Sequence, residues 1–73
     1  MVRKIIFYKH YFHDFFNRQP DKVKEKIDFV LYLIENVQRV PTSFLKYITG
    51  TDGLFEIRIQ VGTNIFRFFC FFD

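Results

Sequence analysis

The sequence has a single cysteine, Cys70, and no long run of apolar residues. One cysteine excludes an intramolecular disulfide, so we expect a reducing compartment. The N-terminus, Met1 to Lys4, leads into an apolar run that is too short for the core of a secretory signal peptide. No stretch approaches the roughly 20 apolar residues of a membrane span. We therefore expect a soluble, cytoplasmic protein with no membrane partner.

The chain is rich in aromatic residues. Of its 73 residues, 49% are hydrophobic, and they include 12 Phe and 4 Tyr. A chain of this length forms a single domain, which we place at residues 1–73, and it needs a dense core. Some of the Phe side chains must lie outside that core, on a second buried face, on a partner or on exposed surface. The net charge of +3 permits a nucleic-acid partner but does not require one.

The pattern of apolar residues predicts the order β-α-α-β-β. Strands are expected at 2–8, 54–61 and 64–72, helices at 10–18 and 21–38, and a connection at 39–53. The long helix carries the strongest signal, because apolar residues recur along one face of it: Val23, Ile27, Val30, Ile34 and Val37, widened by Phe29, Leu31 and Leu33. This order favours an α+β fold, with two helices packed on one face of an antiparallel sheet.

The last two strands are expected to form a hairpin. Gly62-Thr63 suits a two-residue type II′ turn, which prefers glycine first. This turn pairs Phe55 with Cys70, Ile57 with Phe68 and Ile59 with Phe66 on one apolar face. A slip of one residue would mix the two faces, so burial supports this register.

The same register places Arg58 directly opposite Arg67 on the other face. Like charges across a ladder are unfavourable unless an anion relieves them. Glu56 is one possible source of relief, on an ordinary solvated face. A bound phosphate is the other, because the planar guanidinium group of arginine holds phosphate oxygens in pairs. The geometry of the hairpin leaves both interpretations open.

Other candidate residues carry weaker signals. His10 and His13 have a spacing that can place two metal ligands on one helix face, but no third ligand is clustered with them, and we assign no metal site. Cys70 is expected to be a small buried side chain rather than a nucleophile. The aromatic residues of the first helix are expected to lie in the core: Tyr11, Phe12, Phe15 and Phe16. If they are exposed instead, Tyr8 and Tyr11 are of a type that stacks on nucleobases. Charges of both signs on the long helix are typical of a solvated face, or of a basic edge that contacts RNA: Lys22, Lys24, Lys26, Arg39, Glu25, Asp28 and Glu35.

With these features in place, the sequence resembles the RelE/HigB toxin superfamily, and most closely its phage-derived HigB-like branch. The resemblance covers nearly the whole chain, and its most specific parts are "TDGLFEIR" (51–58) and "FRFF" (66–69). It implies the toxin of a type II toxin–antitoxin system, a ribosome-dependent endonuclease that cuts mRNA and is neutralised by an antitoxin. On that pattern Arg58 and Arg67 are catalytic and bind RNA, and Lys46 adds phosphate attraction. The chemistry needs no cofactor or metal ion.

The resemblance also predicts what this chain lacks. Members of the superfamily continue with a further strand and a terminal helix, so residues 1–73 correspond to a domain shortened at its C-terminus. The strand at 64–72 is then expected to be an exposed apolar edge that could join copies of the chain into a homo-oligomer. No spacing identifies the general acid or base; the candidates are Glu56, His10, His13 and the tyrosines. The alternative function is a noncatalytic domain that binds an antitoxin, itself or RNA through that edge.

Overall fold

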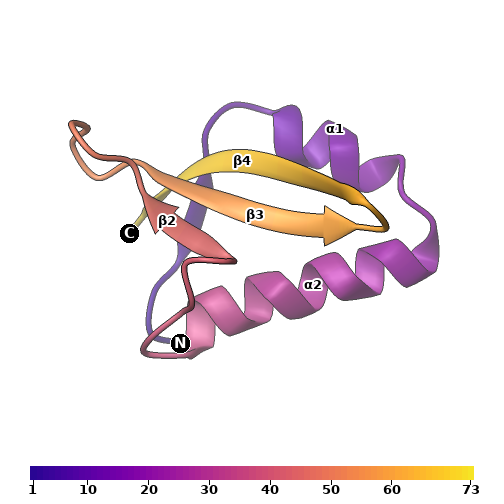
Figure 1. Cartoon of the computed structure of the whole chain (residues 1–73), viewed down its shortest axis with the longest axis horizontal. Helices are drawn as coiled ribbons and strands as arrows, with labels where there is room; N and C mark the ends of the chain where they lie inside the picture. Colours follow the sequence, from indigo (N-terminus) through magenta and orange to yellow (C-terminus); the bar gives the residue numbers. More distant parts are fainter.

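The computed structural model describes residues 1–73, and its elements follow the predicted order with one addition (Figure 1). They are β1 (Ile5–Phe7), α1 (Tyr11–Asn17), α2 (Asp21–Asn36), β2 (Leu45–Tyr47), β3 (Phe55–Val61) and β4 (Asn64–Phe72). The four strands form one antiparallel sheet in the order β1-β4-β3-β2. The predicted α+β class is therefore confirmed.

The β3–β4 hairpin has the predicted register. Phe55 pairs with Cys70, Ile57 with Phe68 and Ile59 with Phe66. Gly62 has φ +61°, while Thr63 stays outside the left-handed region, as a type II′ turn requires. Alternation along both strands therefore separates one apolar face from one mixed face.

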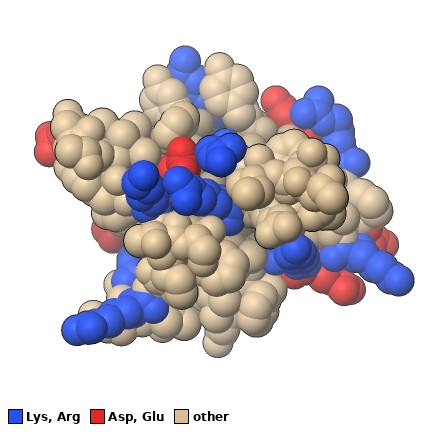
Figure 2. All heavy atoms as spheres, in the orientation of Figure 1, with Lys and Arg blue, Asp and Glu red and all other residues tan.

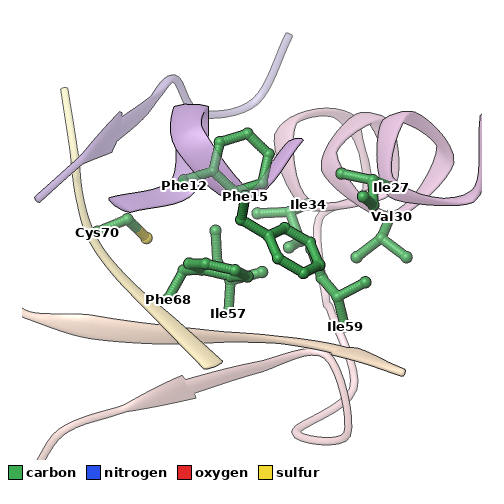
Figure 3. Close-up of a cluster of buried hydrophobic side chains, with 9 residues drawn as sticks. All are labelled: Phe12, Phe15, Ile27, Val30, Ile34, Ile57, Ile59, Phe68 and Cys70. Carbon is green, nitrogen blue, oxygen red and sulfur yellow. The ribbon is translucent and has the colours of Figure 1, made fainter. Parts of the chain in front are cut away.

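The hydrophobic core lies between the two helices and the apolar face of this hairpin (Figure 3). Two α1 residues, three α2 residues and four hairpin residues form it: Phe12, Phe15, Ile27, Val30, Ile34, Ile57, Ile59, Phe68 and Cys70. Ile27, Ile34, Ile57 and Ile59 are completely buried. Because both helices contact the same side of the sheet, the opposite side carries no helix.

The structure differs from the predicted exposure at two aromatic residues. Phe29 was assigned to the buried face of the long helix, but 60% of its surface is exposed. Tyr11, at the start of α1, is 65% exposed. Phe29 is next to the buried Val30, and Tyr11 is next to the buried Phe12. A helix that packs on so small a sheet buries only a narrow stripe of its surface. The surplus of aromatic residues is thus partly on the surface.

The N-terminal segment binds the end of α2, which shortens both predicted elements. The helix ends at Asn36 because Val37 has extended backbone angles, with ψ 132°. Arg3 donates from its guanidinium group to the carbonyls of Val37 and Gln38, at 2.9 and 2.8 Å, and also contacts the Ile34 carbonyl. Val2 and Arg3 are therefore used to cap a helix instead of extending β1. Neither helix combines the length and apolar character needed to cross a bilayer.

Two predictions about the sheet are wrong. The segment 39–53, expected to be a connection, contains a short strand, β2. The strand at 64–72 is not an open edge along its whole length, because β1 pairs with its C-terminal part, Ile5 opposite Phe72 and Phe7 opposite Cys70. The N-terminal strand thus occupies a position beside β4 that we had assumed to be empty. The exposed edges of the sheet are β1, β2 and the N-terminal part of β4, so the apolar β4 edge that could join copies of the chain is shorter than predicted.

Candidate phosphate-binding surface on the open sheet face

The face of the sheet away from the helices carries the three predicted site residues. Arg58 on β3 lies opposite Arg67 on β4, as predicted. Lys46 on β2 lies opposite Glu56 on β3. Since Glu56 and Arg58 are two residues apart on one strand, all four side chains share one face. The structure therefore brings together Lys46, Arg58 and Arg67, which come from three different strands.

Glu56 is the centre of this group. Its Oε1 atom lies 2.7 Å from Arg58 Nε and 3.9 Å from Arg67 Nε. The Glu56 side chain is only 12% exposed, whereas Arg58 is 30% and Arg67 52% exposed. One partly buried carboxylate thus relieves the repulsion between two arginines, as the first interpretation of the pair expects.

The carboxylate does not neutralise the surface. Lys46, Arg58 and Arg67 supply three positive charges against the one negative charge of Glu56. The more distant and more exposed arginine, Arg67, keeps most of its donors free for another anion. In the face drawn in Figure 2, basic side chains gather beside acidic atoms over the strands of the sheet, with uncharged atoms on both sides. The surface therefore retains a local excess of positive charge.

The two arginines also line a pocket of about 340 Å³. Its other walls come from Ser43 and Phe44, which precede β2, and from Gln60 and Ile65 on the hairpin. Arginine, serine and glutamine side chains all donate hydrogen bonds, and none of them carries a negative charge. A phosphate group suits this donor set, because arginine binds phosphate oxygens in a planar, bidentate geometry.

The backbone fixes the position of the arginine pair. Arg58 donates its N–H to the Phe44 carbonyl at 2.8 Å, on the β2 side of β3. The Arg58–Arg67 pair is therefore a non-hydrogen-bonded pair of the β3–β4 ladder, the kind in which opposing side chains approach more closely. Two guanidinium groups are held side by side on a sheet rather than on a loop, which limits their movement.

Other candidate residues lie away from this surface. The His13 ring packs edge-on against Phe7 and Phe12, with ring centres 6.2 and 6.0 Å apart. His10 is exposed and precedes α1. Cys70 is fully buried in the core, as predicted, and burial raises the pKa of its thiol to about 12. Of the acid or base candidates, Glu56 is the one in contact with the arginines.

Two polar residues that line the pocket, Ser43 and Gln60, were not predicted from the sequence. Gln60 follows Arg58 by two positions on the same strand, so the alternation that placed Arg58 on the open face also applied to Gln60. Ser43 reaches the pocket from the segment before β2. No periodic signal in the sequence marks that segment, so Ser43 could be found only from the fold.

Comparison with known proteins supports the resemblance in its coarser form. The family model described as phage derived protein Gp49-like (DUF891) matches residues 14–73, which include the end of α1, all of α2, β2 and the whole hairpin. No curated protein and no solved structure matches the chain. The matched range covers Lys46, Glu56, Arg58 and Arg67. The chain belongs to the Gp49-like family of phage-derived proteins, which is a family of RelE-like toxins.

Proposed function

We propose that this protein is the toxin of a type II toxin–antitoxin system and cuts mRNA on the translating ribosome. Within the RelE-like toxins we place it in the HigB-like branch, with residues 1–73 forming one toxin domain. Membership of the Gp49-like family supports a toxin. The nuclease activity, the ribosome as its site of action and the cytoplasm as its location are parts of the proposal.

One observation carries the proposal: two arginines lie side by side on an open sheet face and line the same pocket. Two like charges held together cost free energy in the isolated protein. Glu56 offsets part of that cost, but Arg67 lies 3.9 Å from it and remains half exposed. A phosphate between the guanidinium groups would offset the rest, so the surface is suited to bind a phosphodiester.

The proposed reaction is attack by a 2′-hydroxyl on the adjacent phosphorus. A bond forms between the 2′-oxygen and phosphorus while the bond from phosphorus to the 5′-oxygen breaks. The proton of the 2′-hydroxyl passes to solvent, and the leaving 5′-oxygen gains one. Negative charge builds on the nonbridging oxygens, where Arg58 and Arg67 donate to it, and Lys46 attracts the RNA backbone from the neighbouring strand. The products are a 2′,3′-cyclic phosphate and a 5′-hydroxyl.

The proposed partners follow from this role. Translated mRNA and the ribosome supply the substrate and its geometry, and a cognate antitoxin neutralises the toxin. The surface is small and its cations are few, so the ribosome must contribute to positioning the RNA. This reasoning predicts cleavage of mRNA on ribosomes and little cleavage of the same RNA free in solution.

The test is a reconstituted translation reaction in which cut sites on a defined mRNA are mapped by primer extension. We expect site-specific cuts with the unaltered chain and none with the double variant Arg58→Ala/Arg67→Ala. Arg18→Ala is the matched control, because Arg18 is exposed, forms no ion pair and lines neither pocket. It should cut as the unaltered chain does.

The opposite pattern would count against the proposal. If soluble, folded protein makes no cuts, or if the double variant cuts at the same sites, the arginine pair is not the catalytic surface. The first of these results would favour a noncatalytic domain that binds RNA or an antitoxin. That alternative would be limited to the N-terminal part of the β4 edge, since β1 occupies the C-terminal part.

A further inference from the structure

A second pocket lies on the other side of Arg67. It has a volume of about 300 Å³, and Tyr8, Lys9, Tyr11, Arg67 and Phe69 form most of its wall. Arg67 is the residue that lines both this pocket and the one shared with Arg58. A ligand bound at the arginine pair therefore has a second compartment directly next to it.

The pocket exists because β1 is shorter than β4. The β1–β4 ladder ends where the Tyr8 N–H donates to the Phe69 carbonyl, at 2.9 Å. At Lys9 the chain turns away from the sheet with φ +62°, and α1 begins at Tyr11. The part of β4 from Asn64 to Phe68 has no strand beside it on this side, and the pocket occupies the start of that gap.

Backbone groups of Arg67 face this gap. Arg58 and Arg67 form a non-hydrogen-bonded pair, since the Arg58 N–H is directed to Phe44 on the far side of β3. The N–H and C=O of Arg67 therefore point away from β3, toward the side where β1 has ended. This edge offers one donor and one acceptor, spaced as in a strand, to whatever enters the pocket.

Three of the aromatic rings that line the pocket are open to solvent, while the other two, Phe12 and Phe68, belong to the core. Tyr8 and Phe69 are nearly half exposed, and Tyr11 is 65% exposed, so the rings are not used by the core. The Lys9 ammonium group lies 5.2 Å from the centre of the Tyr8 ring, which adds a positive charge at the rim. Exposed rings beside cations are the combination that single-stranded nucleic acids bind, by stacking of bases and attraction of phosphates.

We propose that this pocket holds one unstacked nucleobase of the RNA strand whose phosphate lies between Arg58 and Arg67. The inference rests on the proposed function for the identity of the strand as RNA. The base would stack on Tyr11 or Tyr8, and its polar edge would meet the N–H and C=O of Arg67. Arg67 would thus contact phosphate with its side chain and base with its backbone, which would couple cleavage to the base at one position.

An extended peptide pairing with the free edge of β4 is the competing occupant. The aromatic walls favour the base, because a strand added to β4 needs a flat edge and gains little from tyrosines that stand beside it. The two occupants give different results in the experiment below, so the test decides between them.

The test measures binding of a short single-stranded oligonucleotide by fluorescence anisotropy. The probe is a tetranucleotide with 2′-deoxy sugars, which cannot be cut by 2′-hydroxyl attack, and a second set of probes carries one abasic position in turn. We expect Tyr11→Ser to weaken binding of the complete probe by about tenfold, the size of one lost stacking contact. One of the abasic probes lacks the base that occupies the pocket, and this probe should bind Tyr11→Ser and the unaltered chain with equal affinity.

Two control variants make the result specific. Tyr32 on α2 is 63% exposed, almost the same as Tyr11, but lies outside both pockets. Tyr32→Ser should bind every probe as the unaltered chain does, and Tyr11→Phe, which keeps the ring, should stay within about twofold of it. Thermal melting of each variant shows whether a loss of affinity reflects a loss of fold.

Several outcomes would overturn the inference. It fails if folded Tyr11→Ser and Tyr32→Ser bind the complete probe equally, or if no abasic position removes the effect of Tyr11→Ser. Either result would leave the gap available to an extended peptide. The proposed function is tested separately and fails if mRNA is not cut on ribosomes. In that case, a loss of affinity in Tyr11→Ser that depends on one base would identify a nucleic-acid site without catalysis.

Discussion

Replacing Glu56 by glutamine tests whether one carboxylate holds the arginine pair together. The Oε1 atom lies 2.7 Å from Arg58 Nε, and both side chains are less than one-third exposed. A hydrogen bond to a charged group contributes about 1.5–3 kcal/mol, while an exposed ion pair contributes about 0.2–1 kcal/mol. The contact with Arg67, at 3.9 Å and half exposed, adds little. Glutamine keeps a neutral acceptor of similar shape, so we expect a loss of about 1 kcal/mol in the free energy of unfolding.

In a domain of this size, a loss of about 1 kcal/mol lowers the melting temperature by roughly 4–8 °C. Scanning calorimetry measures this shift, and Glu25→Gln is the matched control, because Glu25 is exposed on α2 and forms no ion pair. Inorganic phosphate should stabilise Glu56→Gln more than the unaltered protein, since the anion replaces the lost carboxylate between the arginines. If Glu56→Gln and Glu25→Gln have the same melting temperature, both with and without phosphate, the arginines do not need an anion and the reasoning is refuted.

Three further predictions concern the frame around this surface. Arg3→Ala should lower the free energy of unfolding by about 1–3 kcal/mol in urea denaturation, because carbonyls at the end of α2 lose their partner; Lys4→Ala, at an exposed position, should not. Burial raises the pKa of the Cys70 thiol from 9.0 to about 12, so its contribution to stability is present below pH 9 and is lost as the pH rises toward 12. The stability difference between the unaltered protein and Cys70→Ala should therefore shrink over that range, and a constant difference would contradict the burial argument. Lys9→Gly should raise the melting temperature, because glycine relieves the left-handed backbone at φ +62°, while weakening oligonucleotide binding; a lower melting temperature would show that Lys9 is not strained.

Much of the hairpin could be predicted because a period of two residues is a strict constraint. Once Gly62-Thr63 was assigned as the turn, the pairing of Arg58 with Arg67 followed from counting, and burial excluded the neighbouring registers. The three site residues share a face for the same reason. Lys46 reached that face through β2, which only the fold revealed, although the basic position itself was identified from the family resemblance.

The errors came from contacts between segments that are distant in the sequence. Arg3 and the C-terminus of α2 are more than 30 residues apart, so no local pattern indicates that Val2 and Arg3 cap a helix. The pairing of β1 with β4 also joins segments that are distant in the sequence. The prediction that the last strand is an open edge did not take the first strand into account. Exposure of Phe29 and Tyr11 depends on how much of each helix a small sheet can cover, which composition does not determine.

The central claim is that Arg58 and Arg67 stabilise the charge that develops when mRNA is cut, and single-turnover cleavage on purified, stalled translating ribosomes tests it most directly. With ribosome complexes saturated by toxin, the measured rate constant reports the chemical step. We expect Arg67→Ala to lower this rate constant by about 100-fold, the effect of removing one preorganised donor to a developing anion, while Arg18→Ala, at an exposed position without an ion pair, leaves it unchanged. A folded Arg67→Ala protein that cuts at the unaltered rate would contradict the account.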